Sequence, residues 1–325
     1  MLLVADTHFD DQPSSEYRWD VFKEIKRWIL LQEHSCEVAI LGDLADRKDK
    51  HSGKLVNRLV AELDEVTGMG AVVTIIKGNH DDPISGVPYW NILGKLPNVR
   101  FYGAEPVLDK SKRLWLPFTH NPASWDFSKY KSARVAFMHD TVTGAYIHHR
   151  KFMNERMPKL PTNIPIYSGD IHYPQTMGNF TYVGAPHPVR FGDDHPCRML
   201  EIDDETFQIT QEIHMPSIEK SIVTVSSIHD LDELIPKRGD QMRVRLSLKA
   251  SRVEQWAEDE RAVMEWAEKH GVEVASVEAL VETDTHSKFL GEALSNPFEV
   301  YDEFCKAEGL TGDIYTAGME LLKGH

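Results

Sequence analysis

Cysteine is scarce in this chain of 325 residues, which has only Cys36, Cys197 and Cys305, all far apart in the sequence. Their scatter excludes a disulfide framework and gives none of the paired spacing that thiolate zinc sites show. Long apolar runs are also missing, since none approaches the roughly 18 residues of a membrane helix, and the N-terminus lacks the features of a signal peptide. We therefore expect a protein of a reducing cytoplasm, or of the host cytoplasm if the chain is viral.

An excess of positive charge is equally absent. The formal net charge is −15, and residues 216–325 contribute −10 of it. This balance argues against broad, charge-driven binding of nucleic acid through a basic face. The densest basic stretch either contacts a nucleic-acid backbone or is a solvated loop. It consists of His148, His149, Arg150, Lys151, Arg156 and Lys159.

Strand-like and helical patterns alternate at the start of the chain. Apolar runs at 1–5, 38–41 and 71–76 predict buried strands, and residues 17–31 and 55–66 have apolar side chains at helical spacing. This order predicts a βαβαβ unit with parallel strands, and open α/β sheets have their active sites at the carboxyl ends of such strands. A second sheet packed on the first is expected from the short runs at 99–102, 114–116, 135–138, 166–168, 180–183 and 199–202.

A domain boundary is expected near residues 215–220, where the pattern restarts. A strand at 242–248, a helix near 253–270 and a strand at 272–280 predict a small αβ module. The expected organisation is therefore a core of residues 1–215, an αβ domain of residues 216–296 and a helical tail of residues 297–325.

Clusters of polar side chains follow five of the predicted strands. They are Asp6-Thr7-His8, Gly42-Asp43-Leu44-Ala45-Asp46, Gly78-Asn79-His80-Asp81, His139-Asp140 and Gly169-Asp170-Ile171-His172. Carboxylate, amide and imidazole groups suit Mn²⁺, Fe²⁺ or Zn²⁺ better than a thiolate-seeking metal. Any one cluster is most simply explained as structural residues at a strand end. Their joint occurrence at five strand ends predicts a metal site.

In order and spacing these clusters resemble the motifs of the calcineurin-like metallophosphoesterase superfamily over residues 1–200. The resemblance implies an α/β fold, with an αββα sandwich of two sheets as the core, followed by a small C-terminal αβ capping domain and a helical tail. It also implies two metal ions, one held by Asp6, His8 and His172 and the other by Asn79, His139 and Asp170, with Asp43 bridging both. His80 would be the general acid, and Asp81 would orient it.

The chemistry of such a site is self-consistent. Two cations neutralise the phosphate oxygens and lower the pKa of a bound water, and an imidazole supplies the proton for the departing oxygen. Asp170 departs from the superfamily pattern, which has histidine there. A carboxylate at this position favours the harder Mn²⁺ or Mg²⁺, and the alternative is that Asp170 lies outside the metal shell. We expect two divalent ions, first of all Mn²⁺, with Mg²⁺, Fe²⁺ and Zn²⁺ as alternatives.

Later segments resemble the nuclease branch of the superfamily, typified by bacterial SbcD and its eukaryotic, archaeal and phage counterparts. These segments are residues 138–144, 167–175, 178–186 and Phe191-Gly192-Asp193. The resemblance implies a DNA nuclease with 3′-to-5′ exonuclease and single-strand endonuclease activity. It further implies a coiled-coil ATPase subunit of the SbcC type as partner in DNA repair and recombination, and a homodimer.

Two other functions stay open. One is a stand-alone metallophosphoesterase acting on small phosphodiesters, other small molecules or phosphoproteins, and the other is an inactive scaffold of the same fold. The complete ligand set argues against the scaffold. In the tail, an apolar helix face either packs on the protein's own core or docks the ATPase partner. This face comprises Phe298, Tyr301, Phe304 and Leu310.

Overall fold

The computed structural model describes residues 1–34, 36–83, 86–122, 125–147, 150–151, 160–249 and 255–282, together with residues 301, 305, 315 and 316. The side chains of residues 150, 151 and 282 are not described. Most of the basic stretch and most of the predicted tail face lie outside the described residues, including His148, His149, Arg156, Lys159, Phe298, Phe304 and Leu310. Within the described part, no helix is long and apolar enough to cross a membrane.

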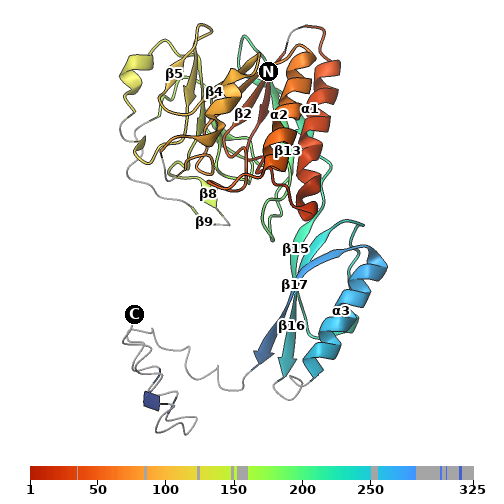
Figure 1. The fold of residues 1–325 in the computed structure, drawn as a ribbon. Helices are drawn as coiled ribbons and strands as arrows, with labels where there is room; N and C mark the ends of the chain where they lie inside the picture. The colour runs from red at the N-terminus through yellow and green to blue at the C-terminus, as the bar shows by residue number, and fades with distance from the viewer. Residues whose placement is uncertain are drawn as a thin grey trace.

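The first sheet contains the predicted βαβαβ unit (Figure 1). Its order is β14-β13-β1-β2-β3-β4, with β1 to β4 parallel, β13 antiparallel to β1 and β14 antiparallel to β13. The strands β1, β2 and β3 are buried almost throughout, as expected when both faces of a parallel sheet are covered. Their bounds are β1 Leu2–Val4, β2 Glu37–Leu41, β3 Val72–Ile76, β4 Val99–Tyr102, β13 Arg198–Ile202 and β14 Ile209–His214.

Two amphipathic helices, α1 (Asp20–Leu30) and α2 (Gly53–Gly68), connect β1 to β2 and β2 to β3 and lie on one face of this sheet (Figure 1). Buried residues at helical spacing give each helix one apolar side. Ser52 caps α2, because its side chain accepts a hydrogen bond from the backbone N–H of Leu55 at 3.0 Å. The buried apolar residues are Val21, Phe22, Ile25, Trp28 and Ile29 on α1 and Leu55, Leu59, Leu63 and Val66 on α2.

A second sheet packs on the first, as predicted. Its order is β11-β12-β10-β7-β6-β5, and β6, β7, β10 and β12 are parallel. A buried apolar cluster joins the two sheets, with Leu3 and Leu41 from the first and Phe137 and Tyr167 from the second. The bounds are β5 Val107–Leu108, β6 Arg113–Leu116, β7 Val135–His139, β10 Ile166–Gly169, β11 Gln175–Met177 and β12 Phe180–Tyr182.

The prediction that the runs at 99–102 and 199–202 belong to the second sheet was wrong. Both are strands of the first sheet: β4 pairs with β3, and β13 pairs with β1, opposite to it in direction. The apolar pattern of a short strand shows that it is buried, but its sheet is decided by backbone hydrogen bonds to residues far away in the chain. The remaining short elements of the core are β8 Tyr146–Ile147, β9 Arg150–Lys151, and the 3₁₀ helices η1 Pro13–Trp19, η2 Tyr89–Lys95 and η4 Phe127–Tyr130.

Within the described residues, the C-terminal sheet has three parallel strands in the order β15-β16-β17, accompanied by the α-helix α3 (Trp256–His270). It has its own apolar core, in which Val244, Leu246 and Val263 are fully or almost fully buried. The expected strand–helix–strand pattern is present, whereas β15 and η5 were not predicted. The bounds are β15 Lys220–Val225, η5 Ile228–Glu233, β16 Gln241–Lys249 and β17 Glu273–Glu282. The domain boundary at residue 215 stays a prediction.

The C-terminal sheet joins the core at Phe191 and Gly192. The amine of Lys220 lies 4.8 Å and the guanidinium of Arg243 4.6 Å from the centre of the Phe191 ring, both within cation–π range. The backbone N–H of Gly192 donates to the carbonyl of Lys220 at 2.8 Å. Burial at this junction lowers the pKa of Lys220 to about 8. A second module is therefore attached to the loop that follows Pro188.

Candidate metal centre and active site

The five predicted clusters lie at the carboxyl ends of β1, β2, β3, β7 and β10, and the structure brings them to one edge of the two sheets. Four of the residues have left-handed backbone conformations, with φ of 53° at Asp6, 41° at His8, 52° at Asp43 and 83° at Asp170. Such conformations are uncommon outside glycine and concentrate at functional sites. At each of these residues the backbone turns sharply after the strand, and the side chains of the predicted ligands can then point toward the same site.

Glycines allow these turns to pack closely. A Cβ atom on Gly78 would lie 2.2 Å from the backbone nitrogen of Asp43, and one on Gly169 would lie 2.3 Å from the carbonyl of Leu41. Both contacts are with backbone, which cannot move aside cheaply. The glycines of the motifs are thus required for the close approach of the loops.

Asp6, His8 and His172 form a first group, whose ligand atoms lie within 4.8 Å of one another. Burial raises the pKa of Asp6 to about 6 and lowers that of His8 well below its usual value. Oδ2 of Asp6 and both ring nitrogens of His8 have no hydrogen-bond partner among the described residues. Buried polar atoms of this kind normally have partners. A divalent cation fits the group, since it would satisfy these atoms and favour the charged carboxylate.

A second set of acceptors converges around His139. Its Nδ1 lies 2.7 Å from the carbonyl of Leu41, which fixes the proton on Nδ1 and directs Nε2 into the site. Nε2 lies 3.1 Å from the side-chain amide of Asn79, whose nitrogen donates to it, 3.3 Å from Oδ1 of Asp43 and 3.8 Å from Oδ1 of Asp170. Burial opposes protonation of His139, yet Asp43 raises its pKa well above the ordinary value. The carboxylates thus require a positive charge here, which a metal ion would supply in place of a proton.

Asp43 lies between the two sets. Its Oδ2 is 3.5 Å from Nε2 of His8, and its Oδ1 is 3.3 Å from Nε2 of His139. Although burial acts to raise it, the neighbouring His139 brings the pKa of Asp43 below its ordinary value. This is the placement required of a bridging ligand. All seven predicted ligands are thus close together, while their individual metal contacts stay a prediction.

His80 is half-buried beside the first group. Its Nδ1 lies 2.6 Å from the carbonyl of Asp46, and its ring centre is 4.7 Å from that of His8. When Nδ1–H donates to the Asp46 carbonyl, Nε2 can protonate a leaving group only from the imidazolium form, in which both ring nitrogens carry a proton. This arrangement suits the predicted general acid.

Asp81 has a different set of contacts from the one predicted. Its carboxylate accepts hydrogen bonds from the backbone N–H of Gly78 at 2.8 Å and of Leu44 at 3.1 Å. The described contact that orients the ring of His80 is instead the carbonyl of Asp46. Asp81 therefore joins the loops after β2 and β3, and acts on His80 through the backbone.

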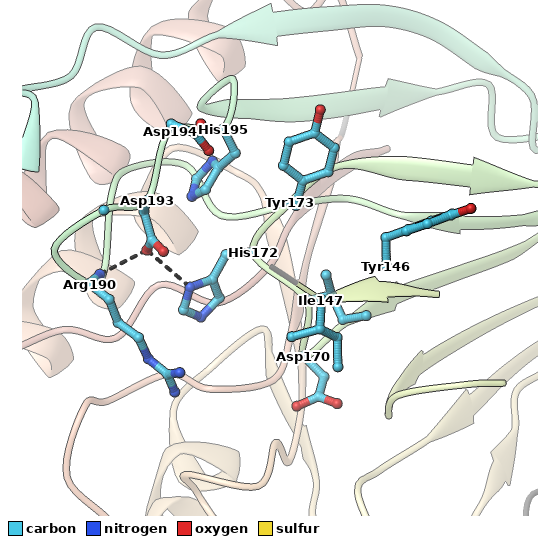
Figure 2. A pocket seen from close by; sticks show the side chains of 11 residues that line it. Tyr146, Ile147, Asp170, His172, Tyr173, Arg190, Asp193, Asp194 and His195 are labelled. Carbon is cyan, nitrogen blue, oxygen red and sulfur yellow. Dashed lines mark hydrogen bonds and ion pairs between the residues drawn. The ribbon is translucent and has the colours of Figure 1, made fainter. Parts of the chain in front are cut away.

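Asp193 is a candidate functional residue, because it contacts the predicted ligand His172, and the sequence did not indicate it. Its Oδ2 lies 3.3 Å from Nδ1 of His172 and accepts hydrogen bonds from the backbone N–H of Val189 and Arg190 (Figure 2). A carboxylate behind a metal-binding histidine fixes its ring and raises its basicity. In the sequence, Asp193 was noted only as part of the Phe191-Gly192-Asp193 segment that resembles the nuclease branch. That resemblance did not predict its contact with His172.

A pocket of about 320 Å³ opens beside Asp170 and His172 (Figure 2). Arg190, Asp193 and His195 lie on one side of it, and Tyr146 and Tyr173 on the other. A substrate in this pocket would therefore contact residues of the predicted metal centre directly.

Comparison with known families decides the assignment. A family model described as calcineurin-like phosphoesterase matches residues 1–203. The chain belongs to this family. As a calcineurin-like phosphoesterase it is a metal-dependent hydrolase of phosphate esters, and its family uses two metal ions.

Several solved structures are also similar to this phosphoesterase, and one of them is a nuclease. The crystal structure of Pseudomonas putida nuclease MPE has 15% sequence identity and a TM-score of 0.32, and the match covers 66% of this chain and 78% of that chain. A likeness of this size carries no conclusion about fold or substrate. No curated protein matches the sequence.

The contact between Asp193 and His172 leads to a prediction. In this phosphoesterase, Asp193→Asn is expected to weaken Mn²⁺ binding by about 10- to 100-fold, because a neutral amide no longer holds the His172 ring as a carboxylate does. Isothermal titration with Mn²⁺ measures the effect. Asp194→Asn is the matched control, since Asp194 lines the same pocket with an exposed side chain. Unchanged affinity in Asp193→Asn, or equal weakening in both variants, would remove this role from Asp193.

Proposed function

We propose that this phosphoesterase is a nuclease that hydrolyses DNA phosphodiester bonds, with Mn²⁺ as its preferred metal. The observation that carries the proposal is the attachment of the C-terminal sheet at Phe191 and Gly192, beside the residue that contacts His172. A module at the rim of the site suits a substrate that extends beyond the reacting phosphate. The nuclease-like order of the segments after Gly169 supports the same conclusion.

The residues have distinct tasks in this reaction. Asp6, His8 and His172 would hold one cation, and Asn79, His139 and Asp170 the other, with Asp43 shared. Bound there, divalent cations supply charge for the phosphate oxygens and a hydroxide near neutral pH. His80 would donate the proton that the departing sugar oxygen requires, with its ring held by the Asp46 carbonyl.

The finer features of the function rest on the sequence resemblance. We propose 3′-to-5′ exonuclease and single-strand endonuclease activity, a coiled-coil ATPase partner of the SbcC type, a role in DNA repair and recombination, homodimerisation and a cytoplasmic location. The proposed docking face for the ATPase is in the tail. Of that tail the structure describes four residues, and the rings of Tyr301 and Tyr315 are stacked with centres 6.0 Å apart.

A small-molecule phosphodiesterase is the second candidate. The net charge of −15 and the aspartates of the pocket favour it, because both repel a long polyanion. The inactive scaffold is disfavoured, since the seven predicted ligands and His80 are all present and close together.

The choice of substrate separates these candidates. With Mn²⁺, the purified protein is expected to cleave single-stranded DNA and bis-p-nitrophenyl phosphate, and to hydrolyse p-nitrophenyl phosphate far more slowly. The expected cause is that a capping module positions a chain rather than a terminal dianionic phosphate. Initial rates on the three substrates measure this, and Asp43→Asn prepared in parallel controls for contaminating nucleases. Fast monoester turnover without DNA cleavage would assign the protein to the phosphatase class.

A further inference from the structure

Two tyrosine side chains stand half exposed on one side of the pocket. Tyr146, in β8, is 54% exposed and Tyr173, in the loop after β10, is 50% exposed. They come from separate segments of the chain but line the same cavity, across from Arg190 and His195 (Figure 2). Exposed aromatic rings offer flat apolar faces, and a planar ligand would bury them.

Gln175 ties the two tyrosines together. Its Oε1 accepts a hydrogen bond from the backbone N–H of Tyr146 at 2.8 Å, and its Nε2 donates to the carbonyls of Tyr146 at 3.0 Å and Tyr173 at 3.4 Å. Gln175 is the first residue of β11. This strand belongs to the same sheet as β10, which is followed directly by Asp170. The backbone positions of both rings are therefore fixed relative to the predicted metal ligands.

The charges of the lining restrict what this pocket binds. Its ionisable residues include three aspartates, Asp170, Asp193 and Asp194, against a single arginine, Arg190. A second phosphate placed among these carboxylates would be repelled. An uncharged planar group would not be repelled by the carboxylates. The pocket volume of about 320 Å³ is also within the usual range for pockets that bind small ligands.

We propose that this pocket binds one unpaired nucleobase, stacked on the ring of Tyr146 or Tyr173, next to the scissile phosphate. The inference rests on the proposed nuclease function and narrows its substrate to strands whose base at this position is unstacked. A base within a duplex has both faces covered by its neighbours, so its release has to precede binding. Stacking on protein aromatic rings tolerates any base, so this site is expected to bind without sequence preference.

Two matched diesters test the proposal. The p-nitrophenyl ester of thymidine 5′-monophosphate and the p-nitrophenyl ester of the corresponding abasic sugar phosphate share their leaving group and differ only in the base. The ratio of their kcat/KM values, here called the base factor, is expected to exceed 1 in the wild type. Removing both rings by Tyr146→Ala and Tyr173→Ala is expected to lower the base factor by about 5- to 100-fold.

Further variants separate stacking from general damage. Tyr146→Phe and Tyr173→Phe keep the rings and are expected to keep the base factor. Gln175→Ala is expected to lower it, because the rings lose their shared anchor. Tyr89→Ala, which removes a 46% exposed tyrosine outside the pocket, is expected to leave it unchanged.

Each outcome has a distinct meaning. A base factor near 1 in the wild type, or one that survives loss of both rings, would overturn the nucleobase site while leaving the nuclease proposal intact. Failure of the wild type to hydrolyse either diester would overturn the proposed function and the nucleobase site together. A base factor lost in the alanine variants and kept in the phenylalanine variants supports the site.

Discussion

Replacing Asp43 by asparagine is expected to abolish hydrolysis and to reduce the number of bound metal ions. Asp43 lies within 3.5 Å of imidazole nitrogens of both His8 and His139, so its carboxylate faces both halves of the site. Two divalent cations in a common site repel each other strongly, and a shared anionic ligand offsets this repulsion. Metal content by mass spectrometry and initial rates on bis-p-nitrophenyl phosphate measure the two effects.

The control for this variant is Asp64→Asn, an equivalent change at an exposed position on α2. It is expected to keep wild-type metal content and activity. If Asp43→Asn retained both metal ions and more than about a few per cent of the activity, Asp43 would not be the bridging ligand. The two-metal arrangement would then need another shared group.

Replacing His80 by alanine is expected to slow the reaction by about 10²- to 10⁴-fold while the metal ions stay bound. The cause is the loss of the proton donor to the departing oxygen, since His80 is held by the Asp46 carbonyl rather than assigned as a ligand. The effect is expected to shrink on substrates that release p-nitrophenolate, which departs without protonation. The measurements are kcat on an oligonucleotide and on bis-p-nitrophenyl phosphate, with metal content beside them.

His120→Ala is the matched control, because the side chain of His120 is 80% exposed and lies beside Asp82, outside the predicted ligand set. It is expected to behave as the wild type on both substrates. Equal slowing of His80→Ala on good and poor leaving groups would remove the acid role. Loss of metal from His80→Ala would instead identify His80 as a metal ligand. Its position allows this outcome, because the ligand atoms of His80, His8 and Asp43 lie within 4.8 Å of one another.

Local patterns in the sequence predicted the centre of this protein well. The strands β1, β2 and β3 are short apolar runs, each followed within a few residues by Asp6, Asp43 or Asn79. Parallel strands put these ends at one edge of the sheet, so the proximity of the side chains follows from the topology. The βαβαβ unit, the two packed sheets and the gathering of all seven candidate ligands were predictable for this reason.

Contacts set by tertiary structure were not predictable in the same way. Asp193 reaches His172 across 21 positions of sequence, through a loop with no regular pattern. The strand β15 has six residues and is buried only at its two ends, with partly and fully exposed residues alternating between them, which gave too little signal. Asp81 was expected to orient the ring of His80, but its carboxylate accepts hydrogen bonds from the backbone N–H groups of Leu44 and Gly78.

Asp170 shows a limit of another kind. The sequence left open whether its carboxylate lies inside the metal shell. The structure places it 3.8 Å from His139 and in contact with the hydroxyl of Thr141, at the margin of the second set. The residue type predicted that Asp170 can bind a hard metal ion. The distance between its carboxylate and His139 depends on the pairing of β7 with β10, which the sequence did not predict.

The most direct measurement of the metal centre is anomalous diffraction at the manganese absorption edge, from crystals grown with Mn²⁺. We expect two peaks, one surrounded by Asp6, His8 and His172 and the other by Asn79, His139 and Asp170, with the Asp43 carboxylate in contact with both. A single peak, or two peaks that do not share Asp43, would contradict the two-metal site.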